Sequence, residues 1–221
     1  MTRIKICGIT DKAHALAAAE AGANFIGLVF APSQRRVTPA QAREIASAVR
    51  ETSSGTKVVG VFVNAPTFQI NEIADFCALD VVQLSGNESW EYCRRIVNPF
   101  IKAIRIGRQS PEELCAELSA ASKLLAGRRF ITLLDSRVEG KYGGTGEPFD
   151  WDLAREVTKS FPVIIAGGLD PSNVASLIER VSPWGVDVSS GVETGAVKDV
   201  AKIRAFIEAV RKADEKKQAT A

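Results

Sequence analysis

Eight short apolar runs, rich in valine and isoleucine, alternate along the chain with longer stretches whose apolar residues recur at helical spacing. Such alternation is typical of repeated βα units and therefore of a parallel sheet. The predicted strands cover residues 3–8, 24–30, 57–64, 80–84, 100–106, 129–135, 163–166 and 185–189. Eight units in 221 residues leave about 28 residues for each, which predicts a single-domain α/β protein with a closed (β/α)8 barrel, the TIM barrel.

The predicted helices begin at recognisable caps. Thr10-Asp11 precedes a helix over 13–21, Thr38-Pro39 one over 40–50 and Ser110-Pro111 one over 112–121. Polar caps accept hydrogen bonds from the free amides of the first turn, and proline suits the first helical position. Later helices start near 170–171 and cover 200–211. We predict the barrel over residues 1–211 and a frayed helical tail over 212–221.

An open doubly wound sheet is the alternative architecture. Its nucleotide-binding turn would follow the first strand as GxGxxG. This chain instead reads CGIT over residues 7–10. The closed barrel is therefore favoured.

Composition points to a small-molecule partner. The chain is 46% hydrophobic and 24% charged with a net charge of +2, and no basic run is interleaved with aromatic residues. Nothing here favours nucleic acid as a partner. We see no export leader after Met1 and no run long enough to span a bilayer, and the four cysteines are too widely spaced for a CxxC pair. We expect a cytoplasmic protein with free thiols, no membrane partner, and a monomeric or homodimeric state.

Two ionisable side chains stand at strand ends, Cys7 and Asp135. The carboxyl ends of barrel strands converge on one mouth, so the two residues are expected to share a site as an acid–base pair. The competing interpretations are a small buried thiol and a helix cap. The single histidine, His14, falls inside a predicted helix, which excludes a histidine base, a Ser-His-Asp relay and a multi-histidine metal site.

Two glycine-bearing turns follow the last two predicted strands. They contain Gly167, Gly168, Ser189, Ser190 and Gly191. In barrels, these two loops and a short helix N-terminus often bind phosphate, because glycines let backbone amides approach the anion. Glycines are also common in ordinary turns, but the pair in this position favours a phosphate site.

Several segments resemble one family nearly from end to end. They read KICGIT at 5–10, SQRRVTP at 33–39, VGVFVN at 59–64, VQL at 82–84, LLDS at 133–136, GGTG at 143–146, AGGL at 166–169 and GVDVSSGVE at 185–193. This order is similar to that of the phosphoribosylanthranilate isomerase family of tryptophan biosynthesis. Those enzymes rearrange N-(5-phosphoribosyl)anthranilate to 1-(o-carboxyphenylamino)-1-deoxyribulose 5-phosphate. The resemblance also implies a barrel, in agreement with the strand count.

The resemblance assigns roles residue by residue. It implies that Cys7 is the general base, that Asp135 is the general acid, and that Arg35 receives the anthranilate carboxylate. Arg36 keeps the default interpretation for an arginine, a plain surface charge. It implies neither cofactor nor metal. An acid that works near neutral pH needs a raised pKa, which burial at the mouth would supply to Asp135.

The surroundings of Cys7 leave two alternatives open. Strand alternation places Lys5 on the same face as Cys7, so its charge could favour the thiolate. Asp187 shares an inward face with Ser189 and could pair with Lys5 instead, which would weaken that effect. We count Lys5 and Asp187, together with Ser85 after the fourth predicted strand, among the expected substrate-contacting residues.

One departure from the family pattern concerns residue 85. Family members commonly read VQLHG, whereas this chain reads VQLSG over 82–86. Ser85 is shorter and carries no charge, so we expect activity to survive with weaker substrate affinity. A catalytically retired barrel that still binds a phosphorylated ligand is therefore an alternative. A second is a related phosphosugar isomerase of histidine biosynthesis, although its usual half-to-half similarity is not visible. The glycine-rich stretch 140–146 is either a connector or a mobile lid.

Overall fold

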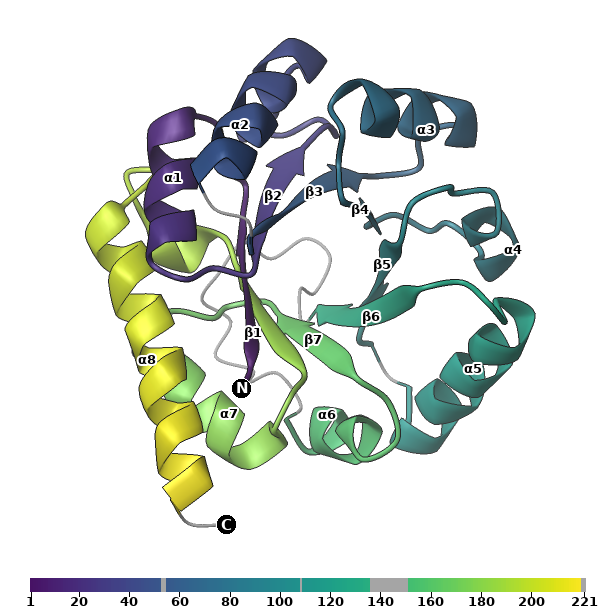
Figure 1. Cartoon of the computed structure of the whole chain (residues 1–221). Helices are drawn as coiled ribbons and strands as arrows, with labels where there is room; N and C mark the ends of the chain where they lie inside the picture. Colours follow the sequence, from purple (N-terminus) through teal and green to yellow (C-terminus); the bar gives the residue numbers. More distant parts are fainter. Residues whose placement is uncertain (53–54, 108, 136–150, 220–221) are drawn as a thin grey trace.

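The computed structural model describes residues 1–52, 55–107, 109–135 and 151–219. Eight parallel strands close into a barrel in chain order, with β1 paired to both β2 and β8, as the sequence predicts (Figure 1). The strands are β1 (Arg3–Cys7), β2 (Phe25–Val29), β3 (Lys57–Phe62), β4 (Val81–Leu84), β5 (Phe100–Arg105), β6 (Phe130–Asp135), β7 (Val163–Ala166) and β8 (Gly185–Val188).

Helices surround the barrel (Figure 1). They are α1 (Lys12–Glu20), α2 (Pro39–Thr52), α3 (Thr67–Phe76), α4 (Trp90–Cys93), α5 (Pro111–Leu124), α6 (Trp151–Thr158), α7 (Val174–Val181) and α8 (Val200–Ala219). Ser110 forms a capping box with Glu113 at the start of α5, and Asp11 accepts from the His14 amide at 3.0 Å. Both contacts satisfy amides that a first helical turn leaves without partners.

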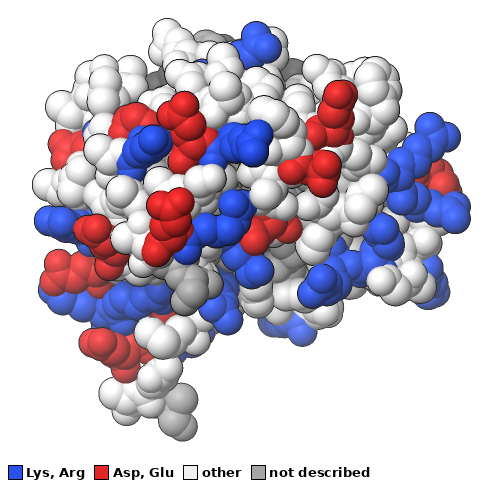
Figure 2. Space-filling view, turned by 45° about the horizontal axis from the view of Figure 1, so that its top comes forward, with Lys and Arg blue, Asp and Glu red and all other residues white. Residues whose placement is uncertain are grey.

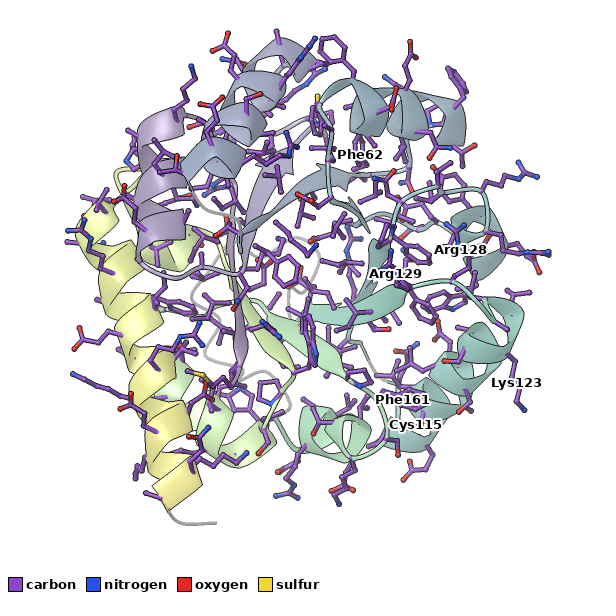
Figure 3. All side chains as sticks on the ribbon, in the orientation of Figure 1. Phe62, Cys115, Lys123, Arg128, Arg129 and Phe161 are labelled. Carbon is purple, nitrogen blue, oxygen red and sulfur yellow. The ribbon has the colours of Figure 1, made fainter. Side chains whose placement is uncertain are left out.

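Strand alternation separates two apolar layers. The residues packed inside the barrel are Val59, Val81, Ile101, Leu133, Ile164 and Ala166. Their neighbours along the strands, such as Val82 and Leu134, pack outward against the helices. Phe62 also points outward, toward α2 and α3, and stacks on Phe30 with ring centroids 4.9 Å apart (Figure 3). Because side chains alternate, a polar residue two positions after an inner apolar one faces the interior at the carboxyl end of its strand.

A short hairpin after β8 was not anticipated. The 3-10 helix η1 (Ser190–Val192) leads into β9 (Glu193–Thr194), which pairs antiparallel with β10 (Val197–Lys198). Ala196 adopts a φ of 64° within the turn. The strands have only two residues each, too few for apolar alternation to be recognised in the sequence.

The last helix continues past the end that the sequence predicts. We expected a frayed tail from residue 212, but α8 extends to Ala219, and Ala213 and Asp214 are buried. Asp214 accepts from both the Thr2 amide and the Thr2 hydroxyl at 2.7 Å. The helix therefore continues because its later turns are buried against the start of β1. As a whole, α8 contacts both α1 and α7 (Figure 1).

The face of the molecule shown in Figure 2 carries both positive and negative side chains, with lysine and arginine interspersed with aspartate and glutamate. This agrees with the net charge of +2. Within the described ranges, no helix is both long and apolar enough to cross a membrane.

Candidate active site

Lys5, Cys7 and Asp187 meet inside the barrel near the carboxyl ends of β1 and β8. The register pairs Lys5 with Asp187, and Lys5 Nζ donates to Asp187 Oδ1 at 2.9 Å. Lys5 is 1% exposed. Gly27 on β2 makes room for this group, because a Cβ there would lie 2.9 Å from Cys7 Sγ and 3.0 Å from Lys5 Nζ. Both side chains therefore lie over the same point of the neighbouring strand.

The protonation of Cys7 reflects opposing influences. Burial raises the pKa of the Cys7 thiol because it disfavours the thiolate. The Lys5 ammonium opposes this shift, Asp187 adds to it, and Lys198 opposes it again. Burial alone would lower the pKa of Lys5, yet Asp187 raises that pKa above its ordinary value, so Lys5 is a cation. The balance of nearby charges thus decides how readily Cys7 ionises.

Arg35 belongs to a second group of charges. Its Nε and Nη2 donate to the two carboxylate oxygens of Glu193 at 2.7 and 2.6 Å. Lys198 Nζ also donates to Glu193, and to the Ser189 carbonyl at 2.9 Å. Burial alone would raise the pKa of the Glu193 carboxyl, but hydrogen bonds from Arg35 and Lys198 outweigh it and lower that pKa. Glu193 is therefore a carboxylate that binds two cations.

The backbone next to Cys7 lies directly against this second group. Gly8 has a φ of 77°, and a Cβ on it would lie 2.5 Å from Arg35 Cδ and 3.2 Å from Ser189 Oγ. Glycine tolerates both the positive φ and the close approach. The end of β1, the segment after β2 and the segment after β8 consequently converge at one place.

The two glycine turns touch each other. A Cβ on Gly191 would lie 1.9 Å from the carbonyl oxygen of Leu169, so only glycine lets the loop after β8 pack on the loop after β7. Gly167 and Gly168 have φ values of 97° and 65°, the left-handed region that glycine adopts without strain. Gly191, after β8, therefore lies directly against the loop that contains Gly167 and Gly168.

Asp135 ends β6 on the inner face, two positions after the inner residue Leu133. Its register partners are Arg105 on β5 and Ala166 on β7, and it is half-buried. It thus faces the same interior as Cys7. The glycine-rich stretch 140–146, considered as a lid, lies outside the described residues.

Ser85 follows β4 and contacts the strand rather than a charged neighbour. Gln83 Nε2 donates to Ser85 Oγ at 3.0 Å. Gln83 shares the inner face with Val81, and its buried Oε1 has no hydrogen-bond partner among the described residues. Ser85 thus accepts from one end of the glutamine amide, and the other end is unsatisfied among the described residues.

A buried ion pair supports the segment after β4. Lys102 Nζ donates to Glu88 Oε2 and to the Gly86 carbonyl, each at 2.9 Å. Glu88 also accepts from the backbone amides of Asn64 and Gly86. Burial alone would raise the pKa of Glu88, but these donors lower it. The pair ties the segments that follow β3 and β4 to the middle of β5, on the outer face of the barrel.

Sequence reasoning missed Glu193 and Lys198 as site residues. Glu193 was noticed only as the end of a family segment, and Lys198 was not singled out. The one signal was a glycine, Gly195, in a turn between two charged residues; the burial of both charges depends on tertiary packing. In the described part of the chain, no group of three or more His, Cys, Asp or Glu side chains is arranged to hold a metal ion.

A separate hollow lies at the opposite end of the barrel. Arg128 and Arg129 precede β6, Phe161 precedes β7, and the three line this hollow together with Leu118 of α5 (Figure 3). Parallel strands place their starts and ends at opposite faces, so this hollow is remote from Cys7.

Comparison with known proteins agrees with the geometry of the mouth. Residues 4–209 match the family described as N-(5'phosphoribosyl)anthranilate (PRA) isomerase. The N-(5'-phosphoribosyl)anthranilate isomerase of Dehalococcoides mccartyi is 46% identical over 215 residues, covering 97% of this chain and 98% of that one. That of Pseudomonas fluorescens is 49% identical over 211 residues, covering 95% of each.

Solved structures lead to the same family. Phosphoribosyl anthranilate isomerase from Thermotoga maritima superimposes with a TM-score of 0.81 at 39% identity, covering 96% of this chain and all of that one. A structure of the isomerase in complex with reduced 1-(o-carboxyphenylamino)-1-deoxyribulose 5-phosphate has a TM-score of 0.78 at 36% identity, with the same coverage. The barrel, its converging strand ends and these relatives together show that the chain belongs to the N-(5'-phosphoribosyl)anthranilate isomerase family.

Proposed function

We propose that this protein isomerises N-(5'-phosphoribosyl)anthranilate in tryptophan biosynthesis, with Cys7 as the general base and Asp135 as the general acid. The observation that carries the proposal is the convergence of an ionisable thiol, an arginine and the glycine turns at the mouth where β6 also ends. The substrate has a phosphate and a carboxylate, and this mouth offers a complement for each.

The reaction needs two proton transfers. Protonated Asp135 donates to the furanose ring oxygen as the bond from that oxygen to C1 breaks, which leaves an iminium. The Cys7 thiolate then removes the proton from C2, and the electron pair of that bond forms the enolamine, which tautomerises to the ketone. After these steps Asp135 has lost one proton and Cys7 has gained one. Proton exchange with solvent returns both groups to their starting states.

The two anionic groups of the substrate fit different parts of the mouth. The backbone amides of the turns at 167–168 and 189–191 receive the phosphate, since glycines allow close approach. Arg35 receives the anthranilate carboxylate. Its Nε and Nη2 donate to Glu193, whereas its Nη1 has no hydrogen-bond partner within the described ranges. An arginine can serve two carboxylates through different edges of its planar fork.

Loss of substrate fluorescence tests the reaction and both assignments. The wild type should turn over, and Cys7→Ala and Asp135→Asn should each lower kcat by at least about 100-fold, the usual contribution of a general acid or base. Cys115→Ala is the matched control, because Cys115 lies on α5 away from the mouth and should retain wild-type rates. Wild-type rates in Cys7→Ala would refute the assignment of the base.

The retired barrel is the second candidate, and Ser85 is the observation that favours it. Calorimetry with the reduced product analogue distinguishes the two. An active enzyme binds the analogue and turns over substrate; a retired barrel binds the analogue without turnover. We further propose that the protein works in the cytoplasm, where its four unpaired cysteines would stay reduced.

A further inference from the structure

The charged side chains around Cys7 form two groups that differ in net charge. Lys5 and Asp187 are a balanced pair with no net charge. Arg35, Glu193 and Lys198 contain two cations and one carboxylate, so this group, the Arg35–Glu193–Lys198 triad, has a net charge of +1. The excess positive charge beside Cys7 therefore comes from the triad and not from Lys5.

We propose that Lys198, fixed by Glu193 and the Ser189 carbonyl, is a positioning residue that gives the triad its net positive charge and so stabilises the Cys7 thiolate. This inference rests on the proposed function, in which Cys7 acts as a base. It assigns to the hairpin β9–β10 the task of bringing a buried cation to the mouth.

The geometry holds Lys198 in place. Its side chain is 1% exposed and that of Glu193 is 5% exposed, so water screens neither charge. Two acceptors, Glu193 and the Ser189 carbonyl, fix the ammonium. Ser189 Oγ lies against Gly8, so the residue that anchors Lys198 packs on the residue that follows Cys7.

Electrostatics agree with this arrangement. Among the described residues, the charged groups that act on Cys7 include Lys5 of β1, Asp187 of β8, Arg35 after β2 and Lys198 of β10, with Glu193 between the last two. Asp135 of β6 faces the same interior. Lys198 lowers the pKa of the Cys7 thiol, in opposition to burial. Burial lowers the pKa of Lys198 itself, and Glu193 opposes that change, which helps to keep the ammonium protonated.

The pH dependence of Cys7 alkylation by iodoacetamide, followed by mass spectrometry on the peptide that contains Cys7, reports the thiol pKa without any need for turnover. Lys198→Met leaves Arg35 and Glu193 as a balanced pair, so the pKa of Cys7 should rise by about 1 unit. Adding Glu193→Gln to Lys198→Met leaves Arg35 alone with a charge of +1, and arginine does not lose its proton. The double variant should therefore return the pKa toward the wild-type value.

The second substitution is expected to reverse the change in the Cys7 pKa that the first one causes. This reversal distinguishes an electrostatic role of Lys198 from a structural one. If Lys198 only supported the fold, the double substitution would disturb the mouth more than the single one and would not restore the pKa. Lys159→Met, a matched change on an exposed lysine after α6, should leave the Cys7 pKa unchanged. Should Lys198→Met fail to fold, Arg35→Met also leaves a balanced pair and should raise the pKa.

An unchanged Cys7 pKa in Lys198→Met, or a further rise in the double variant, would overturn the inference. Turnover by the wild type is measured separately. A protein that lacks isomerase activity but shows both pKa shifts would refute the proposed function and leave the role of Lys198 standing.

Discussion

Lys5 Nζ and Asp187 Oδ1 lie 2.9 Å apart across the pairing of β1 with β8, and both residues are buried. The sequence left open whether Lys5 would favour the Cys7 thiolate or pair with Asp187. The structure shows the pair, and Cys7 Sγ lies close to the same lysine over Gly27. Lys5 therefore acts on Cys7 together with its counterion.

The pair predicts how Cys7 responds to loss of Lys5. In Lys5→Met the Asp187 carboxylate is left beside the thiol, so the pKa of Cys7 should rise and the acidic limb of the pH–rate profile should move to higher pH. Adding Asp187→Asn removes the remaining charge and should reverse most of the shift. Alkylation of Cys7 across the pH range measures both; an unchanged pKa in Lys5→Met would contradict the prediction.

The buried pair of Glu88 and Lys102 predicts a large stability effect. Lys102→Met leaves the Glu88 carboxylate buried with only backbone donors, so the free energy of unfolding should fall by about 3 to 5 kcal/mol. Urea denaturation followed by circular dichroism measures the loss. Lys123→Met, an exposed lysine at the end of α5, serves as the control and should change stability by less than about 0.5 kcal/mol. Equal effects of the two substitutions would argue against the pair.

Glu88 also predicts a pH dependence of stability. Its pKa is lower in the folded protein than the ordinary value of 4.5. The stabilisation is therefore fully present above pH 4.5 and is lost as the pH falls through the lower, folded-state pKa. Melting temperatures of the wild type should fall more steeply below that pH than those of Glu88→Gln. Parallel curves would show that Glu88 does not contribute.

Gln83 predicts a substitution that increases stability. Its Oε1 is buried with no partner in the described part of the chain, and an unsatisfied buried carbonyl costs about 1 to 3 kcal/mol. Gln83→Met keeps the length and removes that group, while water can replace the lost contact at half-buried Ser85. We expect a gain of about 1 kcal/mol in urea denaturation. A loss of stability would indicate that Oε1 has a partner in solution.

Ser85 predicts an effect on substrate affinity. An imidazole at this position reaches farther into the mouth and can carry a charge, so Ser85→His should lower KM with little change in kcat. Ser85→Ala, which removes only the hydroxyl bonded to Gln83, is the control for loss of that contact. Identical kinetic constants for wild type and Ser85→His would show that the position is indifferent.

The sequence predicted the elements whose signals are local. Each strand of the barrel has an apolar run of its own, and Ser110 and Asp11 cap helices through neighbours three residues away. Cys7, Asp135 and Arg35 were recognised through family segments. The roles assigned to these three remain predictions that the proposed assays test.

The features that could not be predicted from the sequence depend on contacts between segments that are far apart along the chain. Glu193 and Lys198 become site residues only because the hairpin turns back onto Arg35, 158 residues from Glu193 along the chain. Asp214, in the part of α8 that was not predicted, is buried where it accepts hydrogen bonds from Thr2. Charged residues near turns are ordinarily exposed, so burial of these groups follows from tertiary packing alone.

The hydrogen bonds between Thr2 and Asp214 have a consequence for folding during synthesis. The two residues are 212 positions apart, and β1 also needs β8 as its second neighbour. During synthesis, the edge of β1 that pairs with β8 has no partner until residues 185–188 have left the ribosome. Pairing between strands that are far apart in the sequence is slow, and until it forms the unpaired strand edge can associate with other chains. We therefore expect aggregation during folding to increase with the time for which this edge of β1 stays unpaired.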